Sequence, residues 1–273
     1  MHGVAEMAFA TAAGRGTCLA RLYQRAPARV LFPDPVDAGQ PLAVLLNTGG
    51  GLVGGDHFEI SVELAAGASA IVTQQAAEKV YRSPAGASRL AMRVHVGAGG
   101  WLEWLPQETI LFDDARLKRR NAIDVAAGGR LLAGEMLVFG RRARGEAFRR
   151  GLIEERWEVR RDGETVWAEA LRLDGDVAAM FEAAAALHGA AAVATTLLIA
   201  DDSTAAVAVA RQTLAAAAVD GVRAAATVVA GVVIIRWWSD DAMTLRAAYG
   251  QTWAMLRHHF GRLRPTLPRL WWT

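Results

Sequence analysis

Four acidic residues stand within or beside apolar, small-residue segments that resemble β-strands: Asp56, Glu78, Glu135 and Glu169. An ionised carboxylate that is buried among apolar groups costs several kcal/mol unless a partner compensates its charge. Arginines are abundant in the chain and could supply such partners. The pattern therefore predicts either structural ion pairs or a functional role for these four acids, and the sequence leaves both open.

The remaining reactive side chains match no familiar active site. The chain has no G-x-S-x-G elbow and no H-E-x-x-H motif, and its single cysteine, Cys18, lies in no recognisable nucleophile context. The six histidines are His2, His57, His95, His188, His258 and His259. None has the spacing of a tight metal site, so we expect each to be an ordinary surface or core residue. The sequence predicts a protein that is not an enzyme and holds no tightly bound cofactor.

A glycine-rich segment, NTGGGLVGGD from Asn47 to Asp56, is a second candidate site, because glycine lets the backbone turn tightly or approach another group. Its glycines satisfy G-x-G-x-x-G, a dinucleotide fingerprint that requires a helix directly after it. The residues that follow, HFEISVEL, instead alternate with the period of two that is typical of a half-buried strand. A glycine-rich turn is therefore the preferred interpretation, and a nucleotide-binding protein remains an alternative.

The composition is that of a globular protein. The chain has 273 residues, of which 53% are hydrophobic and 21% charged. A single cysteine excludes a disulfide framework, and the N-terminal residues lack the basic region of a secretory signal, so we expect a cytoplasmic protein. The longest uncharged run, 183–200, is mostly alanine, which is too weakly apolar to predict a membrane span.

Two arginine clusters, RLKRR at 116–120 and RRARGEAFRR at 141–150, could bind nucleic acid through its phosphates. They are interleaved with Glu146, Glu154, Glu155 and Glu158, and no nucleic-acid-binding motif accompanies them. A salt-bridged solvated face or a protein interface is the preferred interpretation. A nucleic-acid-binding protein remains the alternative.

The strand-like segments of the sequence contain a repeated strand-turn-strand pattern. Leu64-Ala-Ala-Gly-Ala, Val96-Gly-Ala-Gly-Gly and Val125-Ala-Ala-Gly-Gly each end an alternating strand and precede an apolar segment. Units that recur about every 30 residues are typical of stacked architectures, in which each unit buries its face against the next. The sequence thus predicts a mainly β, solenoid-like stack of strands over residues 17–175.

The C-terminal part, 176–273, is expected to contain the helices. Ser203 is a candidate N-cap for an alanine-rich helix that ends at Gly221, and Ser239 for an amphipathic helix that ends at Gly261. A strand is expected between them, over 228–238. A further helix over 176–192 has only its alanine content in its favour.

Five motifs occur together along the chain: NTGGGLVGGD (Asn47 to Asp56), TQQAAEKVYRS (Thr73 to Ser83), WLEWLPQETILFD (Trp101 to Asp113), FGRRARGE (Phe139 to Glu146) and LPRLWWT (Leu267 to Thr273). In this order they resemble the urease accessory protein family UreD, also called UreH, nearly end to end. The resemblance implies a single domain over 1–273 that is a non-catalytic scaffold, β-helix-like with two C-terminal helices. It also implies binding to urease apoprotein, to a UreF-like protein and, through UreF, to a UreG-like GTPase that brings nickel.

That resemblance suggests a role for the acids. Nickel must be handed on and released, and carboxylates hold divalent first-row metals less tightly than thiolate or imidazole. Our hypothesis is that Asp56, Glu135 and Glu169 line an internal polar passage that handles nickel transiently, with Glu78 as a fourth member. No membrane and no nucleic acid enter this interpretation.

Overall fold

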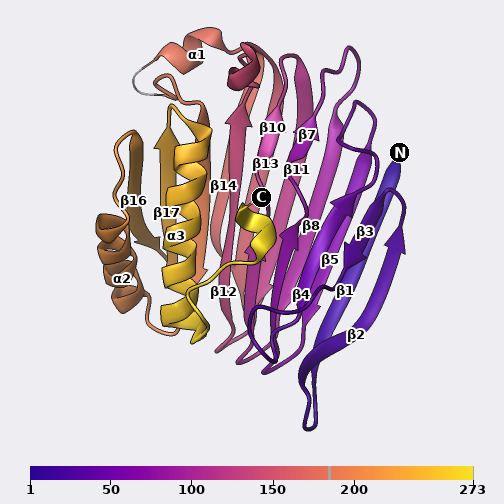
Figure 1. Cartoon of the computed structure of the whole chain (residues 1–273), viewed down its shortest axis with the longest axis vertical. Coiled ribbons are helices and arrows are strands. Elements are labelled where there is room, and N and C mark those ends of the chain that lie inside the picture. Colours follow the sequence, from indigo (N-terminus) through magenta and orange to yellow (C-terminus); the bar gives the residue numbers. More distant parts are fainter. Residues whose placement is uncertain (184–185, 273) are drawn as a thin grey trace.

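The computed structural model describes residues 1–183 and 186–272, and it consists mainly of two β-sheets that face each other (Figure 1). Sheet A contains β1 (His2–Ala12), β2 (Gly16–Arg25), β5 (His57–Leu64), β8 (Ser88–Val96), β11 (Ala115–Val125), β13 (Arg150–Arg161) and β14 (Glu164–Asp176). Sheet B contains β3 (Ala28–Leu31), β4 (Leu42–Asn47), β6 (Ser69–Gln74), β7 (Glu78–Val80), β9 (Trp101–Leu105), β10 (Thr109–Leu111), β12 (Arg130–Phe139), β15 (Ala192–Ile199), β16 (Val222–Val229) and β17 (Val232–Ser239).

The central strands wind as a coil that passes from one sheet to the other. Strands β5, β8, β11 and β13 pair in parallel within sheet A, and β4, β6, β9 and β12 pair in parallel within sheet B. In sheet A the register stacks Val62 on Val94, Val94 on Ile123 and Ile123 on Val159, all buried. This in-register ladder fills the space between the sheets, and it confirms the stacked-strand architecture.

The repeated glycine turns join the two sheets, as the sequence repeat predicts. They connect β5 to β6, β8 to β9 and β11 to β12. Successive turns also hydrogen-bond to each other, since the Gly97 amide donates to the Leu64 carbonyl at 2.7 Å and the Gly67 amide to the Ala98 carbonyl at 2.9 Å. A Cβ on Gly97 would lie 2.6 Å from the Ala66 nitrogen, so only glycine fits at that position of the stack.

Strands extend beyond the predicted range at both ends. The first strand, β1, begins at His2 and pairs in parallel with β5, so the β structure starts before residue 17. The strand expected over 228–238 is instead the hairpin of β16 and β17. Its turn residues Ala230 and Gly231 both have positive φ, the backbone of a tight two-residue hairpin, and this turn was missed.

Two substantial helices lie in the C-terminal part, as expected, and the second ends at Gly261 as predicted, but the N-caps of both and the end of the first differ from the prediction. Helix α2 (Ser203–Ala216) is capped by Asp202, whose carboxylate accepts hydrogen bonds from two backbone amides, and it ends before Gly221. Helix α3 (Ala242–Gly261) is capped by Asp241 and not by Ser239. In both cases an aspartate beside the predicted serine accepts the amide hydrogen bonds, a position where the two residue types are equally favoured.

The alanine-rich segment 176–192 contains only the short helix α1 (Ala178–Glu182), and its residues 184–185 lie outside the described part. The remaining short elements are the 3₁₀ turns Arg142–Arg144 and Arg269–Trp272. None of the helices in the described ranges is long and apolar enough to cross a membrane.

Helix α3 lies on the outer face of sheet B, with α2 beside it against β16 (Figure 1). Beneath it, a second apolar core is centred on Tyr249, Trp253 and Trp271. A buried ion pair joins helix to sheet: Arg257 of α3 lies 3.0 Å from Glu103 of β9 and 3.1 Å from Asp37. The Trp253 indole also donates to Glu103, at 2.9 Å.

We expect Arg257→Met to lower the free energy of unfolding by about 3 to 5 kcal/mol, because it leaves the Glu103 carboxylate buried without its cation. Urea unfolding measures the change. Arg21→Met is the matched control, since it breaks the exposed Arg21–Glu63 pair, and we expect a loss of less than about 1 kcal/mol. Equal unfolding midpoints for the two variants would contradict a stabilising role for the buried pair.

Candidate functional site

Charged side chains meet inside the space between the two sheets. Arg119 of β11 points inward and pairs with Glu155 of β13, with its Nε 2.6 Å from Oε1 and its Nη2 2.8 Å from Oε2. The same guanidinium donates to Glu135 of β12, in the opposite sheet. Arg119 and Glu155 occupy paired positions of the β11–β13 ladder, so the strand register itself brings them together.

Neutral groups complete this interior cluster. Asn121 donates to Glu155 at 3.1 Å, Trp157 donates to Glu135 at 3.1 Å, and Arg119 donates to the Thr109 hydroxyl at 3.0 Å. The two carboxylates therefore share one guanidinium, and each has further hydrogen-bond donors.

The shared cation leaves the two glutamates with different proton affinities. Burial and then the neighbouring Glu155 charge raise the pKa of Glu135 well above its ordinary value. Burial also opposes ionisation of Glu155, but the charge of Arg119 and hydrogen bonds outweigh it and lower the pKa of Glu155. Two like charges around one cation cannot ionise with equal ease, so the cluster favours a protonated Glu135 beside an ionised Glu155.

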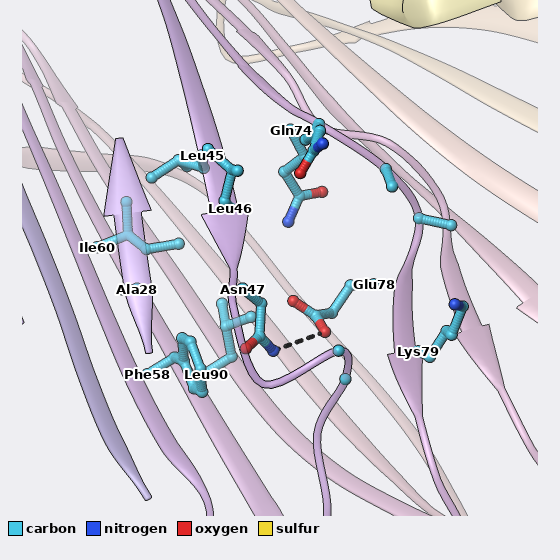
Figure 2. Close-up of a pocket in the computed structure, with 15 residues that line it drawn as sticks. Ala28, Leu45, Leu46, Asn47, Phe58, Ile60, Gln74, Glu78, Lys79 and Leu90 are labelled. Atoms are coloured by element: carbon cyan, nitrogen blue, oxygen red, sulfur yellow. Dashed lines mark hydrogen bonds between the residues drawn. The ribbon is translucent and has the colours of Figure 1, made fainter. Parts of the chain in front are cut away.

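Glu78 lies in a neighbouring cavity of about 120 Å³ at the end of the glycine-rich segment (Figure 2). Figure 2 shows its carboxylate pointing into the cavity, as does the side chain of Gln74, while Lys79 points away. Asn47 donates to Glu78 at 3.1 Å, and among the described residues no cation forms an ion pair with it. Burial raises the pKa of Glu78 to about 7, against the weaker opposing effect of the Asn47 hydrogen bond.

A smaller cavity continues from Glu78 to the interior cluster. It is lined by Glu78, Gln74, Thr109, Arg119, Glu135 and Trp157, and it shares Gln74 and Glu78 with the larger cavity. Of the four acids that the sequence indicated, the structure thus brings Glu78 and Glu135 to one continuous space between the sheets.

Glu169 lies farther along, where the two sheets approach at one edge. It forms an ion pair with Arg236 of β17, and Arg236 also donates to the Thr195 hydroxyl at 2.7 Å. Burial lowers the pKa of Arg236, and the charges of Glu135 and Glu155 partly oppose that shift. We call Glu78, Arg119, Glu135, Glu155, Arg236 and Glu169 the interior polar row. Its outer end is partly exposed, since the side chains of Arg236 and Glu169 are 44% and 33% exposed.

Asp56 stands apart from this row. Its buried carboxylate accepts a hydrogen bond from the Met1 amino group at 2.5 Å and one from the Val53 amide at 3.0 Å. It is not among the described residues that line either cavity. A structural ion pair therefore accounts for Asp56.

The glycine-rich segment is packed against its neighbours and leaves no cradle for a phosphate. A Cβ on Gly51 would lie 2.4 Å from the Tyr81 ring, and one on Gly54 would lie 2.0 Å from the Ser83 hydroxyl oxygen. The segment also pairs with β7, since the Leu52 amide donates to the Lys79 carbonyl at 2.7 Å. The close approach of residues 79–86 of the same chain explains why glycines stand at these positions.

Sequence reasoning missed three members of the polar row: it did not consider Arg236, and it assigned Arg119 and Glu155 to a solvated face or a protein interface. Arg119 and Glu155 are both buried. The residues directly before them, Lys118 and Glu154, form an ion pair at 3.3 Å on the outer face of the sheet. The signal was present in the alternation of β11, where Leu117, Arg119, Asn121 and Ile123 all face inward.

Comparisons with known proteins identify the family of this chain. The family model described as "UreD urease accessory protein" matches residues 1–272. The chain belongs to the UreD family. It is therefore a urease accessory protein, and the resemblance seen in its motifs is confirmed.

Individual UreD proteins support this assignment. The chain is 43% identical to the urease accessory protein UreD of Magnetococcus marinus over 274 residues, which covers 99% of this chain and 94% of that protein. It is 48% identical to the UreD of Rhodopseudomonas palustris over 168 residues, which covers 62% of this chain and 60% of that protein. The match to UreD 3 of Methylorubrum extorquens is 46% identical and covers 59% of that protein.

The raised pKa of Glu78 predicts a pH-dependent stability. Between the ordinary glutamate pKa of 4.5 and about 7, the folded state holds a proton that the unfolded state has lost, so stability falls as pH rises through this window and then levels off. Glu78→Gln removes the ionisation and can still accept the Asn47 hydrogen bond. We expect it to stabilise the protein by on the order of 3 kcal/mol at about pH 8, and to have little effect at the acid end of the window.

Urea unfolding of both proteins across this pH range measures the difference. Glu63→Gln, on the exposed face, is the control that should leave the pH profile unchanged. Parallel profiles for Glu78→Gln and the parent chain would show that Glu78 titrates normally.

Proposed function

We propose that this UreD-family chain is a non-catalytic scaffold of urease activation that also gives nickel a path through its interior polar row. In this proposal the chain binds urease apoprotein on one side and a UreF-like protein on the other, and the UreF-like protein recruits a UreG-like GTPase. The assembly works in the cytoplasm, and nickel is its cargo.

The continuous cavity between Glu78 and Glu135 is the observation that carries the passage. A row of acids between two apolar sheet faces is costly to bury, and it supplies carboxylate ligands within a largely apolar core. Oxygen ligands hold nickel more weakly than thiolate or imidazole, which suits a cation that must be released. Both glutamates point into the space that such a cation would cross.

The four acids have different places in this proposal. Glu78 is the best candidate ligand, because within the described residues it has a hydrogen-bond partner but no ion-pair partner. Glu135 shares Arg119 with Glu155, so one of the two carboxylates can turn to a cation while the other keeps the guanidinium. Glu169 lies at the far edge of the row with Arg236. Asp56 lines neither cavity, and it is included in the proposal only because it ends the glycine-rich segment, part of which lines the larger cavity.

The outer face of sheet A supports a protein partner over the nucleic-acid alternative. Several of its cations are paired with acids, as in the pairs Lys118–Glu154 at 3.3 Å and Arg160–Glu158 at 2.7 Å. A duplex requires a continuous positive face, and this alternation does not provide one.

The double variant Glu78→Gln/Glu135→Gln tests the passage. We expect it to keep the complex with urease and the accessory proteins but to lower nickel per urease active site several-fold, since neither position can then supply a carboxylate ligand. Pull-down from co-expressing cells measures the complex, and metal analysis of the purified urease measures the nickel.

Three further variants separate passage from structure. Glu169→Ala tests the far edge of the proposed path, Asp56→Ala tests the acid that lines neither cavity, and Glu63→Gln on the exposed face is the control for a neutralised glutamate. Normal nickel content in the double variant would rule the passage out and leave the scaffold role standing. Loss of the complex itself would return these acids to a structural role.

A further inference from the structure

Three potential metal ligands meet on the outer face of sheet A: His2, His57 and Glu59. His2 of β1 and His57 of β5 are paired positions of a parallel ladder, and their rings stack with centroids 4.7 Å apart. Glu59 lies two residues beyond His57, so its side chain emerges on the same face. Strand register thus brings together two histidines that are far apart in sequence, a juxtaposition that the sequence did not predict.

The ligand atoms already converge. The Nε2 atoms of His2 and His57 lie 2.7 Å and 3.9 Å from the same Glu59 oxygen, Oε1, and one ligand atom from each residue falls within 4.8 Å of the others. Two ligands of one transition-metal ion, each bound at about 2.1 Å, are separated by roughly 3 Å. Only a small side-chain movement would bring all three atoms to that spacing.

We propose that His2, His57 and Glu59 form a surface site for one divalent transition-metal ion of the nickel and zinc class. Two imidazoles and one carboxylate suit such ions, whereas magnesium and calcium prefer oxygen ligands alone. Three protein ligands on an exposed face leave the remaining coordination positions to water. An ion pair with Glu59 would require only one of the two histidines, so it does not explain why both lie beside this carboxylate.

Arg93 of β8 sets the character of this site. Its Nη1 lies 3.7 Å from the second oxygen of Glu59, Oε2, and so orients the carboxylate while leaving Oε1 to the histidines. Its positive charge also opposes the binding of a cation. We therefore expect an affinity lower than that of a buried three-ligand site, and ready release of the ion.

This site is separate from the interior polar row and does not rest on the proposed function. Alternate residues of β5 face opposite ways: Phe58 and Ile60 line the interior cavity, whereas His57 and Glu59 lie on the other face of the strand. The ion would therefore bind outside the space between the sheets.

Calorimetric titration of the full chain, without a histidine tag, with Ni²⁺ tests the proposal. We expect His57→Ala and Glu59→Gln each to weaken one Ni²⁺ binding event by about tenfold or more, because each removes one of three ligands. Mg²⁺ should give no comparable binding. Nickel X-ray absorption of the loaded chain should show imidazole ligands, and that signature should be lost in His57→Ala.

His95→Ala is the matched control. His95 is exposed on the same face and lies 3.8 Å from Asp124, but it is not part of the His2–His57–Glu59 cluster, so its removal should leave Ni²⁺ binding unchanged. The double variant Glu78→Gln/Glu135→Gln should also keep this binding event, which separates the surface site from the passage. Circular dichroism checks that each variant is folded. The variant Glu59→Gln provides a second test if His57→Ala misfolds.

Unchanged Ni²⁺ binding in both His57→Ala and Glu59→Gln would overturn the proposal, as would an equal loss in His95→Ala. Absence of any Ni²⁺ binding event in the parent chain would overturn it as well.

Discussion

In-register parallel pairing between successive coils governs which side chains meet in this protein. Each strand of sheet A places its residues directly beside those of the strand one coil away, and the same ladder produces apolar stacks, ionic pairs and the histidine pair. At inward-facing positions the ladder places Val62 on Val94 and Arg119 beside Glu155. At an outward-facing position it places His2 beside His57. A one-residue slip would exchange the two faces and destroy all of these contacts together.

The interior polar row is the main exception to an otherwise apolar interior. One buried guanidinium can balance only one of the two carboxylates that it serves, and the raised pKa of Glu135 keeps the second carboxyl protonated. Replacement of such groups by hydrophobic residues of similar volume is often neutral or stabilising in other proteins. The retention of several charges in one connected space is therefore better explained by a role than by stability, and it is the physical basis for our nickel proposal.

The C-terminal part performs a different task. Helices α2 and α3 cover the outer face of sheet B and enclose a second core, while sheet A keeps its outer face open. The Glu103–Arg257 pair ties α3 to the coil through fully buried atoms, whereas ion pairs on the outer face of sheet A are largely exposed. Helices thus pack on the outer face of sheet B, whereas the outer face of sheet A is exposed and carries charged side chains.

Local patterns in the sequence determined much of the architecture. The period of two, the three glycine turns and the alanine-rich segments predicted the stacked strands and the two larger helices, because each depends on residues close together in the chain. The sequence also singled out Glu78 and Glu135, since a carboxylate among apolar neighbours is visible locally. Only the tertiary structure decided their partners. The Arg119–Glu155 pair, the cavity between Glu78 and Glu135, and the meeting of His2 with His57 all depend on strand register across sequence separations that no local pattern encodes.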